Sequence, residues 1–246
     1  MKVIDYILNK IENGTLHMGL IDPDEQTPEE AGDLAEILEN AGSDAIMVGG
    51  STGITKENLD KTVKSMADKV ELPIIHFPTK AGAMSKYVNA IYFMSMLNSK
   101  DLSKVIGEQV RGAPIIKKMN IEPIPMGYVI VEPGMKVGEV GNADLISRDN
   151  PKSVINYGLA AQYLGMKLFY LEAGSGSPEP VPLDMIKAYK KNVDIPLIVG
   201  GGIRNYKQAK KIADAGADVI VTGTVLEESK KVSKKMKELI SALKEC

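Results

Sequence analysis

Cysteine is almost absent from this sequence of 246 residues, and the single one, Cys246, is the last residue. No disulfide can form within the chain, which fits a reducing compartment, and we expect a cytoplasmic location. The opening segment, MKVIDYILNK, is amphipathic and lacks the apolar run and small-residue cleavage site of a signal peptide. Apolar runs stay short of the ~20 residues of a membrane span, so we expect no transmembrane segment.

An excess of either charge sign is also missing. The 32 acidic and 30 basic residues leave a net charge of −2, which gives no footprint of nucleic-acid binding. No two aspartates are adjacent, so the aspartate-rich Mg²⁺ motif of ordinary prenyl synthases is absent. Hydrophobic residues make up 44% of the chain, which is ample for a core. The composition therefore indicates a globular protein that neither binds nucleic acid nor spans a membrane with a helix.

Short apolar runs alternate with longer segments of helical period along the whole chain. In TPEEAGDLAEILENAG, Thr27, Pro28 and Glu30 form a capping box with proline at the first helical position. Recurring strand–helix units predict a parallel sheet, and eight of them predict one (β/α)₈ TIM barrel over residues 1–246. The expected strands are 16–22, 45–49, 74–77, 90–94, 124–131, 168–172, 197–200 and 219–222.

The connection between the third and fourth expected strands is too short for the usual helix. PTKAGAMSKYVN has a dozen residues, a glycine at position 82 and no apolar period, whereas a parallel crossover normally contains a helix. We expect this helix to be missing or replaced and the barrel wall to be thin there. The large apolar residues nearby predict either core packing or an apolar groove for a ligand: Phe77, Met84, Tyr87, Tyr92, Phe93, Met94 and Met96.

Glycines follow the last three expected strands, at Gly174-Ser175-Gly176, Gly200-Gly201-Gly202 and Gly223-Thr224. Phosphate sites of TIM barrels lie beside the last loops, where backbone N–H groups point at the anion. The glycines alone would also serve in tight turns, but three sets on neighbouring strand ends favour a phosphate site. The hydroxyls of Ser175 and Thr224 would add donors to it.

Carboxylates and hydroxyls at the first, second and sixth strand ends are candidates for chemistry. Asp22 and Asp24 follow the first strand, and Ser51 and Thr52 follow the second. Oxygen ligands without histidine or cysteine suit Mg²⁺, although an Asx turn explains the aspartates equally well. Glu172, where a strand meets the glycine loop, is the candidate general base, with a solvated or ion-paired strand end as its alternative.

Seven segments together resemble the geranylgeranylglyceryl phosphate synthase family: LIDPD, VGGST, FMSMLNS, IEPIPMGYVIVEPG, YLEAGSG, VGGGIR and TGT. They run from residue 20 to 224 in the order of that family. The resemblance implies a TIM barrel with its third helix replaced. It also implies transfer of the geranylgeranyl group from geranylgeranyl diphosphate to the sn-3 hydroxyl of sn-glycerol 1-phosphate, the first ether of archaeal membrane lipids.

The resemblance also assigns roles to residues of this sequence. Glu172 and Tyr170 are expected to be catalytic, and Asp22 and Ser51 are expected to bind Mg²⁺. The phosphate of the acceptor is expected at Tyr170, Leu171, Glu172, Ala173, Gly174, Ser175, Gly176, Gly201, Gly202, Gly223 and Thr224.

Other functions and partners stay open on the sequence alone. A longer prenyl donor is one alternative, because one sequence does not give the depth of a groove. GGGIR and TGT also resemble the phosphate loops of flavin-dependent barrels, and a non-catalytic phosphate binder would keep the glycines without needing Glu172. We further expect a homo-oligomer. The lysine-rich segment from residue 230 predicts a last outer helix, with a transient membrane-surface contact as the weaker interpretation.

Overall fold

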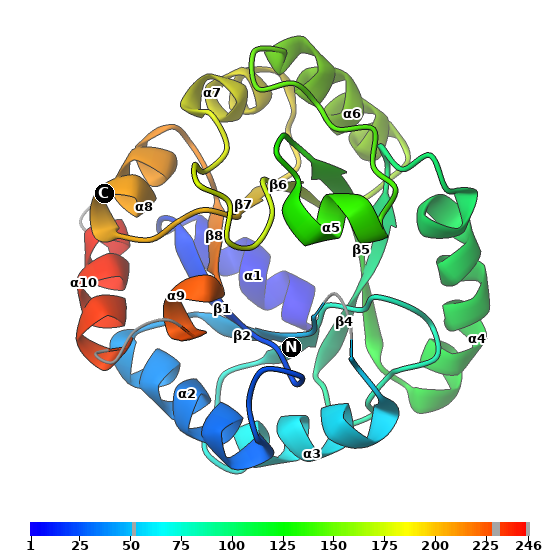
Figure 1. Cartoon of the computed structure of the whole chain (residues 1–246), viewed down its shortest axis with the longest axis vertical. Coiled ribbons are helices and arrows are strands. Elements are labelled where there is room, and N and C mark those ends of the chain that lie inside the picture. Colours follow the sequence, from blue (N-terminus) through cyan, green and yellow to red (C-terminus); the bar gives the residue numbers. More distant parts are fainter. Residues whose placement is uncertain (51–52, 228–231, 245–246) are drawn as a thin grey trace.

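Eight parallel strands form a closed barrel in the computed structural model, which describes residues 1–50, 53–227 and 232–244. Each strand pairs with its neighbours in sequence, and β1 closes the barrel by pairing with β8 (Figure 1). The strands are β1 (Leu16–Ile21), β2 (Ala45–Val48), β3 (Ile74–His76), β4 (Ala90–Met96), β5 (Glu122–Ile130), β6 (Leu168–Glu172), β7 (Leu197–Gly200) and β8 (Val219–Thr222). The predicted TIM barrel is confirmed, with every expected strand present.

Helices surround the barrel, as the helical segments of the sequence predicted (Figure 1). Thr27 and Glu30 form the expected capping box at the start of the second helix, and Gly42 ends that helix in the left-handed conformation. The outer helices are α2 (Pro28–Ala41), α3 (Lys56–Ala67), α4 (Glu108–Met119), α6 (Pro151–Tyr163), α7 (Leu183–Asn192), α8 (Tyr206–Asp214) and α10 (Val232–Lys244). A π-helical turn, η1 (Ser103–Gly107), precedes α4.

No helix connects β3 to β4. Residues 77–89 form turns and bends instead, so that only a loop covers the barrel between α3 and α4 (Figure 1). The short crossover in the sequence predicted this missing helix. The barrel wall is therefore thin beside β3 and β4.

Alternation along the strands divides the buried side chains into two layers. Side chains such as Met18, Tyr92 and Tyr170 fill the barrel, whereas their strand neighbours, such as Ile91 and Leu171, pack outward against the helices. Successive strand residues point to opposite faces, which explains why the strands are apolar at nearly every position.

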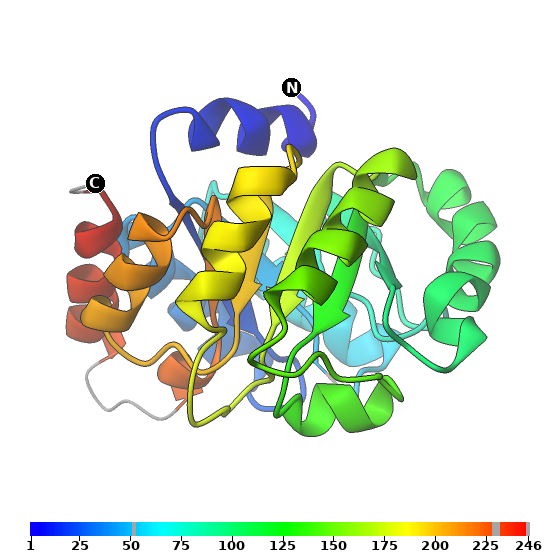
Figure 2. The same cartoon turned by 90° about the horizontal axis from the view of Figure 1, so that it is seen from above.

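The amino-terminal helix α1 (Val3–Ile11) lies across one end of the barrel, and the short helices α5 (Met135–Val140) and α9 (Thr224–Glu227) lie at the other end (Figure 2). Glu122, at the start of β5, accepts hydrogen bonds from the N–H groups of Val3 (2.6 Å) and Ile4 (3.0 Å). Carboxylates stabilise a helix at its amino terminus, where N–H groups lack partners. Glu122 therefore holds α1 over the end opposite the loops that follow the strands.

Asp44 joins the first and last helices of the chain. Its carboxylate forms ion pairs with Lys10 of α1 and Lys244 of α10, each at 2.9 Å, and accepts the N–H of His17 at 3.0 Å. The expected outer helix, α10, buries Met236, among other apolar residues, against the barrel. None of the helices in the described ranges is both long enough and apolar enough to cross a membrane.

Candidate active site

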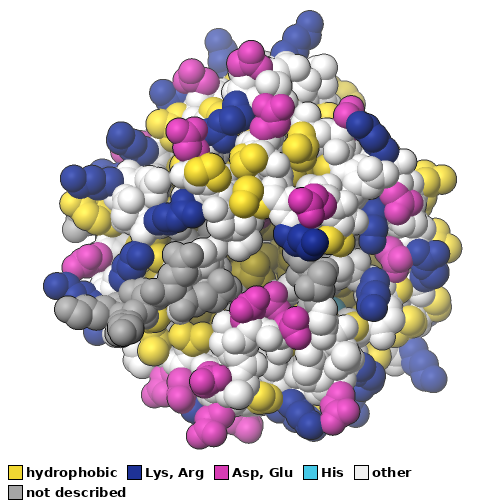
Figure 3. Space-filling view, in the orientation of Figure 1, with side chains coloured by type: hydrophobic (Ala, Val, Ile, Leu, Met, Phe, Trp, Pro, Cys, Tyr) yellow, Lys and Arg dark blue, Asp and Glu magenta, His cyan; other side chains and the backbone are white. Residues whose placement is uncertain are grey.

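A cavity opens where β6, β7 and β8 end, and we call it the β6–β8 cavity. It encloses about 410 Å³, part of which is open to solvent. Figure 3 views this end of the molecule, where acidic and basic side chains are interspersed and the surface is hollowed near its centre. Most of the residues expected at phosphate line the cavity: Tyr170, Glu172, Ser175, Gly176, Gly201, Gly202, Gly223 and Thr224. The fold therefore gathers the three glycine-rich strand ends around one cavity.

Hydroxyl and N–H groups from two loops converge at this cavity. The hydroxyls of Ser175 and Thr224 lie 3.0 Å apart, and the N–H of Gly176 donates to Thr224 Oγ1 at 3.1 Å. Gly174 and Gly176 both have positive φ, at 99° and 72°, which only glycine adopts at little cost. The glycines thus shape a loop whose hydrogen-bond donors suit a small anion.

Glu172 is buried at the end of β6, and two neighbouring donors satisfy its carboxylate. The N–H of Gly174 donates to its Oε1 at 2.6 Å, and the hydroxyl of Tyr170 also donates to the carboxylate. Burial raises the pKa of Glu172, although these hydrogen bonds oppose the shift. Burial and the charge of Glu172 hold the pKa of Tyr170 well above 10, so this hydroxyl stays protonated. The pair combines a carboxylate of raised proton affinity with a permanent donor.

Two glycines of β7 and its following loop leave room for this pair. A Cβ on Gly200 would lie 2.2 Å from the Tyr170 hydroxyl, and one on Gly201 would lie 2.3 Å from Glu172 Oε1. These glycines are needed for close packing against Tyr170 and Glu172, a role that the sequence interpretation did not include.

Two residues expected at phosphate do not reach the cavity with their side chains. Leu171 and Ala173 point outward and belong to the layer between strands and helices. Alternation along β6 places them there, because Tyr170 and Glu172 face inward. The N–H of Ala173 is bonded to the carbonyl of Gly200 at 3.2 Å. Gly174, the third predicted residue outside the cavity lining, contributes the N–H that holds Glu172.

Asp22 lies in the loop just after β1, the strand that pairs with β8. Its Oδ1 accepts the N–H of Asp24 at 2.9 Å, which is the Asx-type turn that the sequence left open. Burial, with the charges of Glu25 and Asp24, raises the pKa of Asp22 to about 6. The carboxylate faces the backbone of Gly50, where a Cβ would lie 1.9 Å from Oδ2.

The other predicted metal ligand, Ser51, lies outside the described residues, as does Thr52. Within the part of the chain that the structure describes, Asp22 forms no ion pair, and no cluster of three or more His, Cys, Asp or Glu side chains could hold a metal. The chemistry of the Asp22 site still fits a hard cation, because a half-buried carboxylate among other acidic groups lacks a positive partner.

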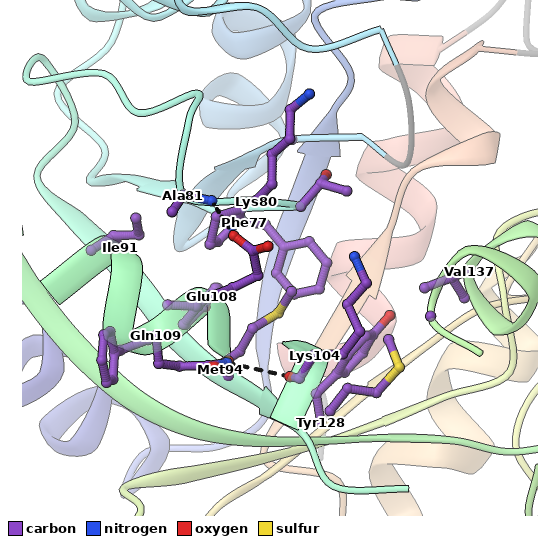
Figure 4. A pocket seen from close by; sticks show the side chains of 18 of the residues that line it. Phe77, Lys80, Ala81, Ile91, Met94, Lys104, Glu108, Gln109, Tyr128 and Val137 are labelled. Carbon is purple, nitrogen blue, oxygen red and sulfur yellow. Dashed lines mark hydrogen bonds between the residues drawn. The ribbon is translucent and has the colours of Figure 1, made fainter. Parts of the chain in front are cut away.

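An apolar groove runs from the mouth of the barrel to its thin side, and we call it the β3–β4 groove (Figure 4). It encloses about 1090 Å³, including space open to solvent. Its inner part is lined by Phe77, Tyr92 and Tyr128, and its outer part by Met84 and Ile116. Because the lining comes from both the inner and the outer layer, the groove passes through the wall where the helix is missing.

Helix α4 forms the far wall of the groove and is fixed by polar contacts. Glu108 accepts the N–H of Ala81 at 2.8 Å, and Gln109 donates to the carbonyl of Met94 (Figure 4). Of the residues that the sequence left between core and groove, Phe77, Met84 and Phe93 line the groove, but Tyr87 does not. Tyr87 is 37% exposed, with the ammonium group of Lys64 4.3 Å from its ring centre. Tyr87 therefore belongs neither to the core nor to the groove lining, a choice that the sequence had left open.

The β6–β8 cavity and the β3–β4 groove meet at four shared residues: Leu20, Tyr170, Glu172 and Ser175. A model of the PcrB family matches residues 8–243. The chain belongs to the PcrB family. The family resemblance inferred from the sequence motifs is confirmed.

Curated relatives and a solved structure agree with this membership. The geranylgeranylglyceryl phosphate synthase of Pyrococcus horikoshii is 53% identical over 97% of this chain and 94% of that protein. That of Methanothermobacter thermautotrophicus is 48% identical over 99% of each. The crystal structure of (S)-3-O-geranylgeranylglyceryl phosphate synthase from Thermoplasma acidophilum, in complex with the substrate sn-glycerol-1-phosphate, matches with a TM-score of 0.98 and 46% identity over 100% of both chains.

Proposed function

We propose that this chain transfers the geranylgeranyl group of geranylgeranyl diphosphate to the sn-3 hydroxyl of sn-glycerol 1-phosphate. The observation that carries the proposal is the junction of the two cavities at Glu172 and Tyr170. One cavity offers donors for a phosphate, the other offers apolar walls for a prenyl chain, and a buried carboxylate lies where the two substrates would meet. The relatives of this chain are named for the same reaction.

Glu172 serves as the general base of this reaction. It takes the proton of the acceptor hydroxyl while the oxygen forms a bond to C1 of the prenyl group, and the bond from C1 to the diphosphate breaks with its electron pair. The raised pKa of Glu172 increases its affinity for that proton. Tyr170 donates a hydrogen bond to the carboxylate, and its proposed part in the reaction is to keep the orientation of this base.

Asp22, together with Ser51, is the proposed Mg²⁺ site. A divalent cation there would neutralise the negative charge that develops on the departing diphosphate. The fit rests on the donor chemistry of Asp22, a half-buried carboxylate whose pKa is raised to about 6 by burial and by acidic neighbours. Bound cation would favour the ionised form of this group.

The phosphate of the acceptor is proposed to bind among Ser175, Gly176 and Thr224. The loop from Tyr170 to Gly176, together with Gly201, Gly202 and Gly223, supplies the shape of this site, and Leu171 and Ala173 support it from the outer layer. A homo-oligomer and a transient membrane contact stay predictions.

The test is a lipid-extraction assay. Purified protein is incubated with Mg²⁺, radiolabelled sn-glycerol 1-phosphate and prenyl diphosphates of increasing length, and the extracted product is counted. Preference for the geranylgeranyl donor is expected. Preference for a longer donor would correct the substrate but not the chemistry, whereas no transfer with any donor, from protein that is yellow with bound flavin, would overturn the proposal.

A further inference from the structure

Arg204 lies at the rim of the β6–β8 cavity, in the connection between β7 and α8. Its guanidinium donates hydrogen bonds to successive carbonyls of the loop after β6. Nη2 donates to Gly176 O at 2.9 Å, and Nη1 donates to Ser177 O at 2.6 Å. Nη1 also approaches Pro178 O at 3.4 Å. The planar fork of this one side chain thus holds three peptide units of the loop.

This contact decides which backbone groups of the loop face the cavity. Gly176 sends its carbonyl to Arg204 and its N–H to Thr224 Oγ1, where the donors converge. A carbonyl oxygen repels an anion, whereas an N–H group attracts it. By holding the carbonyls, Arg204 keeps the donors of the loop on the side where a phosphate would bind.

The charge of Arg204 is also available to a ligand. Across the described ranges, no carboxylate forms an ion pair with this guanidinium, although it lines the cavity. A cation without an acidic partner at the rim of an anion site attracts the anion and lowers the cost of desolvating it.

Arg148 holds a later residue of the same loop, Pro180, and provides a matched comparison. It donates to Pro180 O at 2.8 Å and to Glu132 O at 3.1 Å. Unlike Arg204, it is paired with a carboxylate, that of Glu179 at 3.2 Å, and it does not line the cavity. Both arginines hold the loop through its carbonyls, but only Arg204 also lines the cavity, where its charge can attract an anion.

We propose that Arg204 is a positioning residue that pre-forms the phosphate site of the acceptor substrate. This inference rests on the proposed assignment of the β6–β8 cavity to phosphate. Arg204 fixes the loop so that the Ser175 hydroxyl lies at the cavity and the Gly176 N–H stays bonded to Thr224 Oγ1, and its charge strengthens the attraction of this site for the dianion. It acts on binding of the acceptor and not on the chemical step.

The experiment compares Arg204→Met and Arg204→Lys with Arg148→Met and with Thr224→Val, which removes a hydroxyl inside the cavity. Calorimetry measures the Kd of sn-glycerol 1-phosphate and of inorganic phosphate, and steady-state assays separate KM from kcat. Arg204→Met should weaken phosphate binding about 10- to 100-fold, the effect of losing hydrogen bonds to a charged group. We expect kcat and the KM of the prenyl donor to change little. Arg204→Lys, which keeps the charge without the fork, should give an intermediate Kd.

The other possible results would contradict either the role of Arg204 or the proposed phosphate site. Wild-type affinity in Arg204→Met, with weakened binding in Thr224→Val, would overturn this inference alone. Wild-type affinity in both Arg204→Met and Thr224→Val would mean that phosphate binds outside the β6–β8 cavity. That result would overturn the proposed phosphate site itself, and the role of Arg204 with it. If Arg148→Met loses as much phosphate affinity as Arg204→Met, then Arg204 only anchors the loop, and its proposed role in the phosphate site would be overturned. If Arg204→Met does not fold, wild-type affinity in Arg204→Lys would overturn the inference.

Discussion

The carboxylate of Glu172 is held by the backbone of its own strand end, because Oε1 accepts the N–H of Gly174 at 2.6 Å. Gly174 makes this contact with φ at +99°, so the glycine loop and the candidate base depend on each other. The first glycine of the loop thus positions the base, while the later residues of the loop form the β6–β8 cavity.

Replacing Glu172 by glutamine should remove the base and keep the shape. Glutamine can still accept the N–H of Gly174, so we expect both substrates to bind. Turnover should fall by roughly 10²- to 10⁴-fold, the usual contribution of general base catalysis. Single-turnover rates with saturating substrates measure this directly. Activity close to wild type would restrict Glu172 to positioning and require another base.

Stability should depend on pH through the same group. The folded-state pKa of Glu172 lies above its unfolded value of ~4.3, since burial disfavours the charged form. The folded protein therefore holds this proton more tightly, and stability falls as pH rises from the unfolded to the folded pKa. Glu172→Gln should melt at a higher temperature than wild type at neutral pH. The difference should shrink below pH ~4.3; a constant difference would contradict the assignment.

Asp22→Asn should slow turnover and spare acceptor binding. The loss is expected to be on the order of 10²-fold or more, as for other metal or electrostatic partners. Calorimetry should show weaker binding of Mg²⁺ with diphosphate and an unchanged Kd for sn-glycerol 1-phosphate. Asp24→Asn is the matched control, because the exposed Asp24 contributes its backbone N–H to the turn. Equal effects of the two variants would argue against a special role for Asp22.

Donor length should respond to the outer end of the β3–β4 groove. A Cβ on Gly112 would lie 2.8 Å from the flexible Met84 Cε and 4.0 Å from Ile116 Cδ1, so a larger side chain fills this end. Gly112→Phe should lower the rate with geranylgeranyl diphosphate far more than with geranyl or farnesyl diphosphate, because each excluded CH₂ forfeits about 0.8 kcal/mol of burial.

Gly82→Phe is the control for that variant. Gly82 has no atom within 4 Å of a built Cβ and lies outside the groove lining, so its donor preference should match wild type. If Gly112→Phe slows all donors to the same degree, the prenyl chain does not extend to this end.

The strands and their glycine-rich ends were predictable because both follow from local rules. Continuous apolar runs mark strands buried on two faces, and glycines after three successive late strands must meet at one end of a parallel barrel. The thin wall was predictable for a similar reason, since a dozen residues with Gly82 leave little room for a helix.

The directions of side chains outside regular elements could not be derived in this way. Residues 77–89 have no period, so the sequence does not tell that Met84 faces the groove while Tyr87 faces Lys64. Arg204 was missed because its hydrogen bonds reach a loop 26 to 28 positions earlier in the chain. A cation directly after GGGI, at a predicted phosphate-binding strand end, is the signal that would have found it.

Closure of the barrel by β1 and β8 has a consequence for how the chain acquires its fold. β1 emerges early from the ribosome, but one of its edges finds a partner only when residues 219–222 have been made. Lys244 reaches Asp44 later still. The nascent chain thus carries an unpaired edge through most of its synthesis, a state prone to wrong pairing. Ser175 meets Thr224 only after closure. An acceptor that binds both residues therefore stabilises the completed barrel and none of the partly formed states.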